Sequence, residues 1–409
     1  MDFDLIGLLS VVAVTLIVVL VAKNQPAIAP ILYIALGIRI LAMFLNQDIL
    51  YLPDGTGDAQ RFNLRAEKFS AEGFLVALSN FPGVGSFSIS WIIGILYSLF
   101  GPSELMGQSL SLLFGMGSIF MGWSITKKIW NQSAANKAGW VLALFPSLVL
   151  YSTIMLRESY VCFFLLLAIN GIVDWIHNKN LKSFILVLAG FIGATFFHEP
   201  MILGLIMFIL IILLIYIKTI FIDLINFKIN LKILLVFTIL LTSINFFKDF
   251  RVQKFDGTLF DINTAFERIV IKAREFDKGT AKYPNWAVPK DESEVFYKGP
   301  IRIIYFIYAP FPWDIKKNSH FVGMLDGFFY IFLTYLILYN RKIIWADPAL
   351  RIILLMLIVY ISVYGLGIGN FGTGLRHRSK FVVMFILLIA PFLPNLTFSK
   401  KKKIKNKSE

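Results

Sequence analysis

Residues 4 to 22 read DLIGLLSVVAVTLIVVLVA, an apolar run whose only charged residue is at its first position. A helix of about 20 apolar residues is long enough to cross the hydrocarbon core of a bilayer. No basic residue precedes the run, so it differs from a cleaved signal peptide. We therefore predict that it is the first membrane span.

Similar runs recur along the 409 residues, which are 57% hydrophobic and have a mean hydropathy of +0.74. Only 16% of the residues are charged, whereas soluble domains average about 25%. This composition excludes a soluble globular protein. We predict an all-α, polytopic membrane protein with about 11 transmembrane helices plus interfacial helices on the outer face. The expected spans are residues 4–22, 27–46, 105–126, 137–154, 159–176, 183–197, 200–217, 231–247, 321–340, 350–367 and 380–396.

The net charge of +14 is explained first by topology. With these spans, the lysines and arginines of the short connections fall on one side, which the positive-inside rule makes the cytoplasm. No DNA-binding motif accompanies them, so we expect no nucleic-acid partner. The prediction is a single integral-membrane domain, residues 1–409, in a bacterial inner membrane, with the N-terminus outside and a basic cytoplasmic tail at 397–409.

Two apolar stretches, Phe87–Phe100 and Ile301–Pro312, are short for spans, and the second ends in two prolines that stop a helix. We predict that both lie in the outer interface; the alternative is that one or both cross the membrane. The outer segments are then an acidic loop with interfacial helices, residues 47–104, and a polar loop with an interfacial helix, residues 248–320.

The first outer segment contains the candidate catalytic carboxylates. Asp54 and Asp58 lie in a turn-rich stretch, and a helix is predicted over residues 59–71, with Arg61 in its first turn. A carboxylate at this position also suits a helix N-cap, so a purely structural role for Asp58 stays open.

Two tight outward turns carry further polar candidates for substrate binding. Arg157 and Glu158 form one pair and His198 and Glu199 another. An ordinary interfacial ion pair explains the first equally well. The second lacks the His-Glu-x-x-His spacing of a zinc site.

A glycine-rich segment, residues 367–374, leads into Arg376, His377 and Arg378. Outward loops are normally poor in arginine, and an anion such as phosphate is the simplest reason for this cluster. The alternative is an error in the predicted sidedness. The single cysteine, Cys162, excludes a thiolate metal site, while a divalent ion held by carboxylates stays open.

Three aromatic residues flank the second outer segment: Tyr283, Trp286 and Trp313. Such rings stack on sugars, but an aromatic belt at the membrane interface explains them equally well.

Three stretches between residues 50 and 200 resemble the GT-C superfamily of integral-membrane glycosyltransferases, which includes aminoarabinose transferases and protein O-mannosyltransferases. They are the acidic loop GDAQRF at 57–62, the helix IIGILYSLFGPSE at 92–104, and the segment from KKIWN at 127–131 through ALFPS at 143–147 to Arg157 and Glu158.

The resemblance implies a sugar donor on a polyprenyl phosphate at the outer leaflet, transfer with inversion, and a lipid or glycan acceptor. It makes Asp58 the expected base, with Asp54 in reserve. Arg376 and Arg378 are expected to clamp the phosphate with Arg157 and His198, and Glu158 and Glu199 to orient these cations or the sugar hydroxyls.

Two other functions stay open at this point. One is an O-antigen or exopolysaccharide polymerase or ligase that uses undecaprenyl-diphosphate-linked glycans on the same face. The other is a secondary transporter or flippase, for which Arg39, a charge inside an apolar run, is the main sequence feature. Protein partners are not indicated by the sequence.

Overall fold

The computed structural model describes residues 4–48, 52, 54, 55, 57–225 and 280–395, with isolated positions at 238, 267 and 269–271. Within these residues the chain is all-helical, and the one pairing of extended backbone is an isolated bridge between Lys282 and Asn370. The helices are α1 (Leu5–Asn24), α2 (Ala29–Asp48), α3 (Asp58–Ala71), α4 (Phe74–Ser79), α5 (Ser88–Phe100), α6 (Glu104–Ile129), α7 (Gln132–Leu144), α8 (Pro146–Tyr151), α9 (Glu158–Asn178), α10 (Leu181–Phe197), α11 (Ile202–Ile225), α14 (Glu292–Tyr308), α15 (Asn318–Tyr339), α16 (Arg341–Ala346), α17 (Pro348–Gly367), α18 (Phe371–Arg378) and α19 (Val382–Ile389). Short 3-10 turns are η1 (Glu199–Met201), η3 (Asn285–Ala287), η4 (Pro312–Asp314) and η5 (Ala390–Phe392).

Six helices of the described chain are long and apolar enough to cross a membrane: Leu5–Asn24, Ala29–Asn46, Glu104–Ile129, Glu158–Asn178, His320–Tyr339 and Pro348–Gly367. They match six of the predicted spans. The predicted total of about 11 is not confirmed. At three other predicted spans the apolar helices are shorter, Leu181–Phe197, Glu199–Leu214 and Val382–Phe392, and the span predicted at 231–247 lies outside the described residues.

The span predicted at residues 137–154 is not a single helix in the structure. The chain forms α7 and then α8, with a break at Phe145 and Pro146. Proline has no N–H to donate, and its ring clashes with the carbonyl four residues earlier, so α7 ends there.

Arg39 of α2 satisfies the carbonyl groups that this break leaves without helix partners. Its Nη1 donates to the carbonyl of Ala143 at 2.8 Å, and its Nε donates to Ser152 Oγ at 2.8 Å. A cation also suits the negative end of the α7 dipole. The buried charge of Arg39 is thus explained by the broken helix.

Helix α9, which carries part of the candidate site, packs closely against α10. A Cβ on Gly190 would lie 2.3 Å from the backbone nitrogen of Ala168, and one on Gly171 would lie 2.6 Å from that of Val187. Small residues allow this approach of two helix backbones, as is common in membrane proteins.

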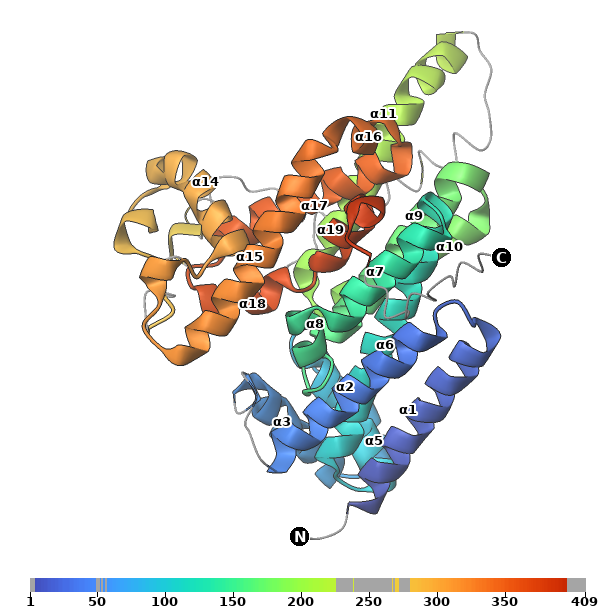
Figure 1. Cartoon of the computed structure of the whole chain (residues 1–409), viewed down its shortest axis with the longest axis vertical. Helices are drawn as coiled ribbons and strands as arrows, with labels where there is room; N and C mark the ends of the chain where they lie inside the picture. The colour runs from blue at the N-terminus through green and yellow to red at the C-terminus, as the bar shows by residue number, and fades with distance from the viewer. Residues whose placement is uncertain are drawn as a thin grey trace, which may run out of the picture.

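Figure 1 shows α3 and α14 at the lower and left sides of the molecule, and α16 with the far end of α11 at the top. The prediction that two prolines stop the helix after residue 301 is confirmed, since α14 ends at Tyr308 before Pro310 and Pro312. Helix α18 lies in the middle and contacts α8, α14 and α15. It therefore brings Arg376 to the interior of the bundle.

Candidate functional site

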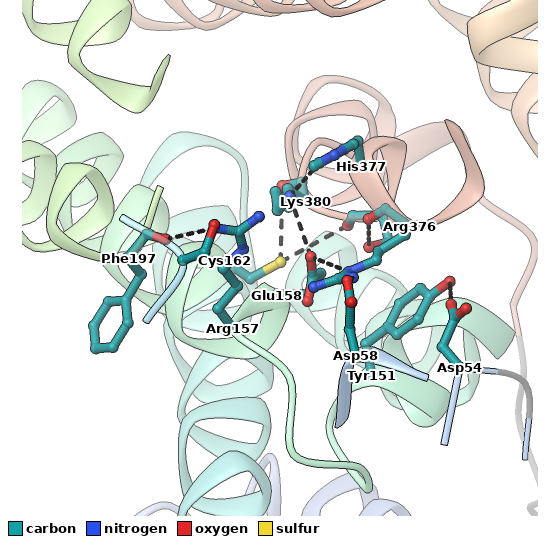
Figure 2. Close-up of polar contacts among 12 residues, drawn as sticks. Asp54, Asp58, Tyr151, Arg157, Glu158, Cys162, Phe197, Arg376, His377 and Lys380 are labelled. Atoms are coloured by element: carbon teal, nitrogen blue, oxygen red, sulfur yellow. Dashed lines mark hydrogen bonds and ion pairs between the residues drawn. The ribbon is translucent and has the colours of Figure 1, made fainter. Parts of the chain in front are cut away.

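Charged side chains from three distant parts of the chain meet around Arg376, as Figure 2 shows. Arg376 of α18 pairs through Nη1 with Asp58 of α3, and its Nε donates to Glu158 Oε1 of α9 at 2.8 Å. Arg376 and Asp58 are 318 positions apart in the sequence. The predicted meeting of the acidic loop with the arginine-rich segment is therefore observed.

Asp58 and Glu158 are the first residues of α3 and α9, where the helix dipole stabilises a negative charge. The interpretation of Asp58 as the helix cap is not borne out, because Gly57 occupies the N-cap position and the Asp58 carboxylate pairs with Arg376. Glu158 is buried, whereas the Asp58 side chain keeps 41% of its surface exposed. Of the two carboxylates, Asp58 is therefore the one that is open to solvent.

Two further cations approach the same carboxylates. Lys380, in the turn after α18, is completely buried, and its Nζ lies 3.3 Å from Glu158 Oε1. Burial lowers the pKa of Lys380 to about 7, against the opposing attraction of Glu158. Arg157 donates from Nη1 to Ser86 Oγ at 2.7 Å, and burial lowers its pKa.

The charge environment of Arg376 differs from that of Lys380. Burial alone would lower the pKa of Arg376, but the charges of Glu158 and Asp58 outweigh this and raise it above its ordinary value. Arg376 therefore stays a permanent cation, and Lys380 changes charge near neutral pH.

The two predicted histidines lie together beside these cations. The rings of His198 and His377 are nearly parallel, with centroids 5.2 Å apart, and Tyr364 contacts both. His377 Nδ1 lies 2.6 Å from Lys380 Nζ. Both histidines thus belong to the cluster.

Glu199 is buried, and its carboxylate lies so close to the backbone of Gly85 that only glycine fits there. A Cβ on Gly85 would lie 2.6 Å from Glu199 Oε1, and Gly85 has a φ of +131°, which disfavours other residues. The loop that contains Gly85 also provides Ser86, the partner of Arg157. Glu199 is thus held near Arg157 by a shared loop.

Asp54 and Arg61 lie at the edge of the cluster. Asp54 has an exposed surface, yet protein around its carboxyl group raises its pKa by burial, opposed by Arg376 and by the hydrogen bond that Tyr151 donates to Oδ2 at 3.1 Å. Arg61 lies 3.5 Å from Asp58, but 73% of its side chain is exposed. A pair as exposed as this contributes little stability.

Arg378, predicted as part of the phosphate clamp, does not join this cluster. Its Nε and Nη2 donate to Asp326 Oδ2 at 3.1 and 2.9 Å, and its Nη1 donates to the carbonyls of Ile307 and Ala309 at 2.8 and 2.7 Å. Arg376 and Arg378 are two positions apart, and residues at that spacing point to different sides of a helix. Arg378 holds the end of α14 against α15 instead.

Several buried polar atoms of the cluster have no hydrogen-bond partner within the described part of the chain. They are Arg157 Nε, Arg376 Nη2, Glu158 Oε2 and Tyr364 Oη. An unpaired buried donor or acceptor costs about 1 to 3 kcal/mol, so a partner such as water or a ligand is expected at these atoms. Two guanidinium donors without partners in one cluster favour an anionic ligand.

A small cavity of about 20 Å³ lies behind Glu158, lined by Arg39, Tyr151, Ser152, Ser159 and Cys162 among others. This space accommodates about one water molecule. It does not extend the cluster into a larger pocket, whereas the Asp58 side chain is 41% exposed.

Metal binding is not indicated by the geometry of the described residues, in which no group of three His, Cys, Asp or Glu side chains is arranged to hold an ion. The predicted alternative of a carboxylate-bound divalent ion stays a prediction.

The aromatic residues near α14 form a separate group. Trp286 and Trp313 are 58% and 70% exposed, and both contact Tyr305, while Trp313 also stacks on Phe311 with centroids 4.9 Å apart. Tyr283 is buried beneath them. Sugar stacking and a membrane-interface belt both stay open for the two tryptophans.

Three residues of the cluster were missed by sequence reasoning: Tyr151, Tyr364 and Lys380. Lys380 had been placed at the start of the last predicted span. A charged residue inside a predicted span was the available signal, because such residues are rare within membrane spans.

Comparison of the chain with family models, curated proteins and solved structures gives no match.

Proposed function

We propose that the protein is a membrane glycosyltransferase that transfers a sugar from a polyprenyl-phosphate donor at the outer leaflet, in the synthesis of a surface polysaccharide or glycolipid. The observation that carries this proposal is the convergence of Asp58, Glu158, Arg157, Arg376 and Lys380 in one cluster. It supplies a reachable carboxylate next to buried cations, the two elements that an inverting sugar transfer from a phosphate requires.

The cations are suited to bind the phosphate of the donor. Arg157, Arg376 and Lys380 face two carboxylates, Asp58 and Glu158, which leaves one net positive charge when all five are ionised. A sugar linked to a lipid through one phosphate carries one negative charge. The unpartnered Nε of Arg157 and Nη2 of Arg376 are the donors available for its oxygens.

Asp58 is the proposed base. When a phosphate accepts hydrogen bonds from both Nη2 and Nη1 of Arg376, the Asp58 carboxylate loses its ion-pair partner at Nη1 and becomes available to an acceptor hydroxyl. The hydroxyl proton moves to Asp58, and the acceptor oxygen bonds to the anomeric carbon from the face opposite the phosphate. The bond from that carbon to the phosphate oxygen breaks, and its electron pair leaves with the lipid phosphate.

Glu158 and Lys380 are proposed as positioning residues. Glu158 is buried and bonds Arg376 at Nε, so it fixes the direction of the guanidinium group. Lys380 balances the charge of Glu158 from the other side. His198, His377 and Glu199 complete the wall of the site.

The proposal keeps the predicted topology of about 11 spans in a bacterial inner membrane, with the N-terminus outside. It requires Asp58 and Arg376 to lie on the same membrane face, and their direct contact supports that requirement.

The transporter alternative loses its main support, because Arg39 is bonded to the broken end of α7. It and the polymerase or ligase alternative remain outcomes of the experiment.

The experiment compares surface glycans in a deletion strain complemented with wild type, Asp58→Asn or Arg376→Lys. We expect both variants to be made at wild-type amounts and to lose the glycan product, with Glu72→Gln as an exposed control on the same outer segment. Normal glycan with either variant would overturn the site. Loss of one sugar supports the transferase, and loss of all repeats beyond the first supports the polymerase. Substrate flux in proteoliposomes without glycosyl transfer supports the transporter.

A further inference from the structure

A groove with basic residues at its mouth lies at the opposite end of α9 from the candidate site. It has a volume of about 370 Å³ and is formed by the end of α9, the middle of α11 and the start of α17. Its lining residues are Trp175, Ile176, Lys179, Ile211, Leu214, Pro348, Arg351, Ile352 and Leu355. The groove is therefore mainly apolar, with two cations.

The two cations have no acidic partner in the groove, since none of the described lining residues is acidic. The carboxylates nearest to these cations in the sequence, those of Asp174 and Asp347, bond other groups. Asp174 is paired with Lys128 at 2.8 Å, and Asp347 caps α17 by accepting a hydrogen bond from the Leu350 N–H at 2.9 Å. Among the described residues, no carboxylate lines the groove beside Lys179 and Arg351.

Local structure fixes the cations at the rim. Lys179 has a φ of +48° and ends α9, so the chain turns there and its side chain is exposed. Arg351 is in the first turn of α17, with its guanidinium 5.9 Å from the ring of Trp345. The start of α17 adds the positive end of a helix dipole to the two charges.

We propose that this groove binds an anionic phospholipid, with the phosphate between Lys179 and Arg351 and an acyl chain along Trp175, Ile211, Leu214 and Leu355. The occupant follows from charge complementarity at the rim and from the apolar floor, which a free anion does not need. Leu214 is 70% exposed, so the floor is open to the lipid side of the bundle. Basic pockets between membrane helices bind acidic headgroups in this way.

The proposal is independent of the glycosyltransferase site. Lys179 follows a predicted cytoplasmic end of a span, so the lipid belongs to the inner leaflet, whereas the sugar donor is expected in the outer leaflet. A lipid here would hold α9, α11 and α17 together at their inner ends.

The test uses the full chain purified in a mild detergent and titrated with dioleoyl phosphatidylglycerol or dioleoyl phosphatidylcholine, with bound lipid counted by native mass spectrometry. We expect wild type to retain phosphatidylglycerol at least tenfold more tightly than phosphatidylcholine. The double variant Lys179→Ala/Arg351→Ala should lose this preference, at roughly fivefold per cation. The control Lys182→Ala/Lys342→Ala removes two exposed lysines that do not line the groove, and should keep it.

Two further measurements separate binding of the acyl chain from binding of the phosphate group. Leu214→Trp fills the groove without changing its charge and should reduce retention of phosphatidylglycerol. Excess inorganic phosphate should leave the lipid bound. Equal retention of the two lipids by wild type, an unchanged preference in the double variant, or displacement by phosphate alone would overturn the proposal.

Discussion

Arg376 and Arg378 are two residues apart on the short helix α18, yet their surroundings differ in kind. Arg376 bonds the side-chain carboxylates of Asp58 and Glu158 and keeps Nη2 without a partner in the described chain. Arg378 bonds Asp326 and the main-chain carbonyls that end α14. Main-chain carbonyls at a helix end cannot turn away, whereas a partly exposed carboxylate such as Asp58 can exchange its partner for a ligand.

Other buried arginines follow the pattern of Arg378. Arg39 donates to the carbonyl of Ala143 at the end of α7, and Arg302 donates to those of Leu366 and Ile368 at the end of α17. In a membrane protein, the carbonyl groups at a helix C-terminus that lies away from water need such donors. Arg376 differs from Arg39, Arg302 and Arg378 because its guanidinium group donates to two side-chain carboxylates and, within the described residues, to no main-chain carbonyl.

The largest effect is expected on stability from Arg378→Ala. The change leaves Asp326 buried without a counter-charge, and breaking a buried ion pair in this way costs about 3 to 5 kcal/mol. Unfolding in mixed micelles measures it, and the double variant Arg378→Met/Asp326→Leu should recover part of the loss. If Arg378→Ala were as stable as wild type, Arg378 would not have the structural role that separates it from Arg376.

The next effect is on turnover, from Arg376→Lys. The charge remains, but lysine cannot bond Asp58, Glu158 and a phosphate with a planar fork. We expect a loss of about 10² to 10³ in rate, typical of one misplaced donor to a developing charge, with near-native stability. The matched control is Arg378→Lys, which should lose stability but keep its rate per folded molecule. Equal rates for the two variants would remove the functional difference between the arginines.

A smaller loss is expected from Arg39→Met. The variant leaves the Ala143 carbonyl without its donor at the break between α7 and α8, at a cost of about 1 to 3 kcal/mol. Unfolding in mixed micelles and glycan synthesis are both measured. Lost synthesis by a fully stable variant would show that Arg39 acts on substrate and would revive the transporter hypothesis.

The smallest effect concerns pH. Because burial lowers the pKa of Lys380 to about 7, its ammonium group is present below pH 7 and is lost above it. We expect donor affinity to fall as the pH rises from 6 to 8, since the cation next to Glu158 disappears. Lys380→Arg stays charged and should flatten this part of the KM profile. The same inflection in Lys380→Arg would assign it to another group, such as a histidine of the stack.

Local sequence was sufficient for several parts of the structure. Helix α3 was predicted over residues 59–71 and begins one residue earlier, because a turn-rich stretch before helically spaced apolar residues is a local signal. The end of α14 before Pro310 and Pro312 was also predicted from a local signal, because proline stops a helix. The sequence did not give the number of spanning helices. Spans are recognised by their apolar composition, and a proline such as Pro146 breaks a helix without changing that composition.

The candidate site was predicted only in part. Asp58, Glu158, His198 and Arg376 were recognised as outward polar residues, but nothing local separates Arg376 from Arg378. Lys380 was absorbed into an apolar run, although it faces Glu158.

The sequence by itself determined that this chain is a helical membrane protein and which of its polar residues topology leaves unexplained, because hydropathy and charge placement are properties of the chain alone. Only the tertiary structure decided which of those residues meet. Contacts over 218 and 318 positions depend on how α3, α9 and α18 pack, and packing assigns one arginine to two carboxylates and its neighbour to the end of a helix.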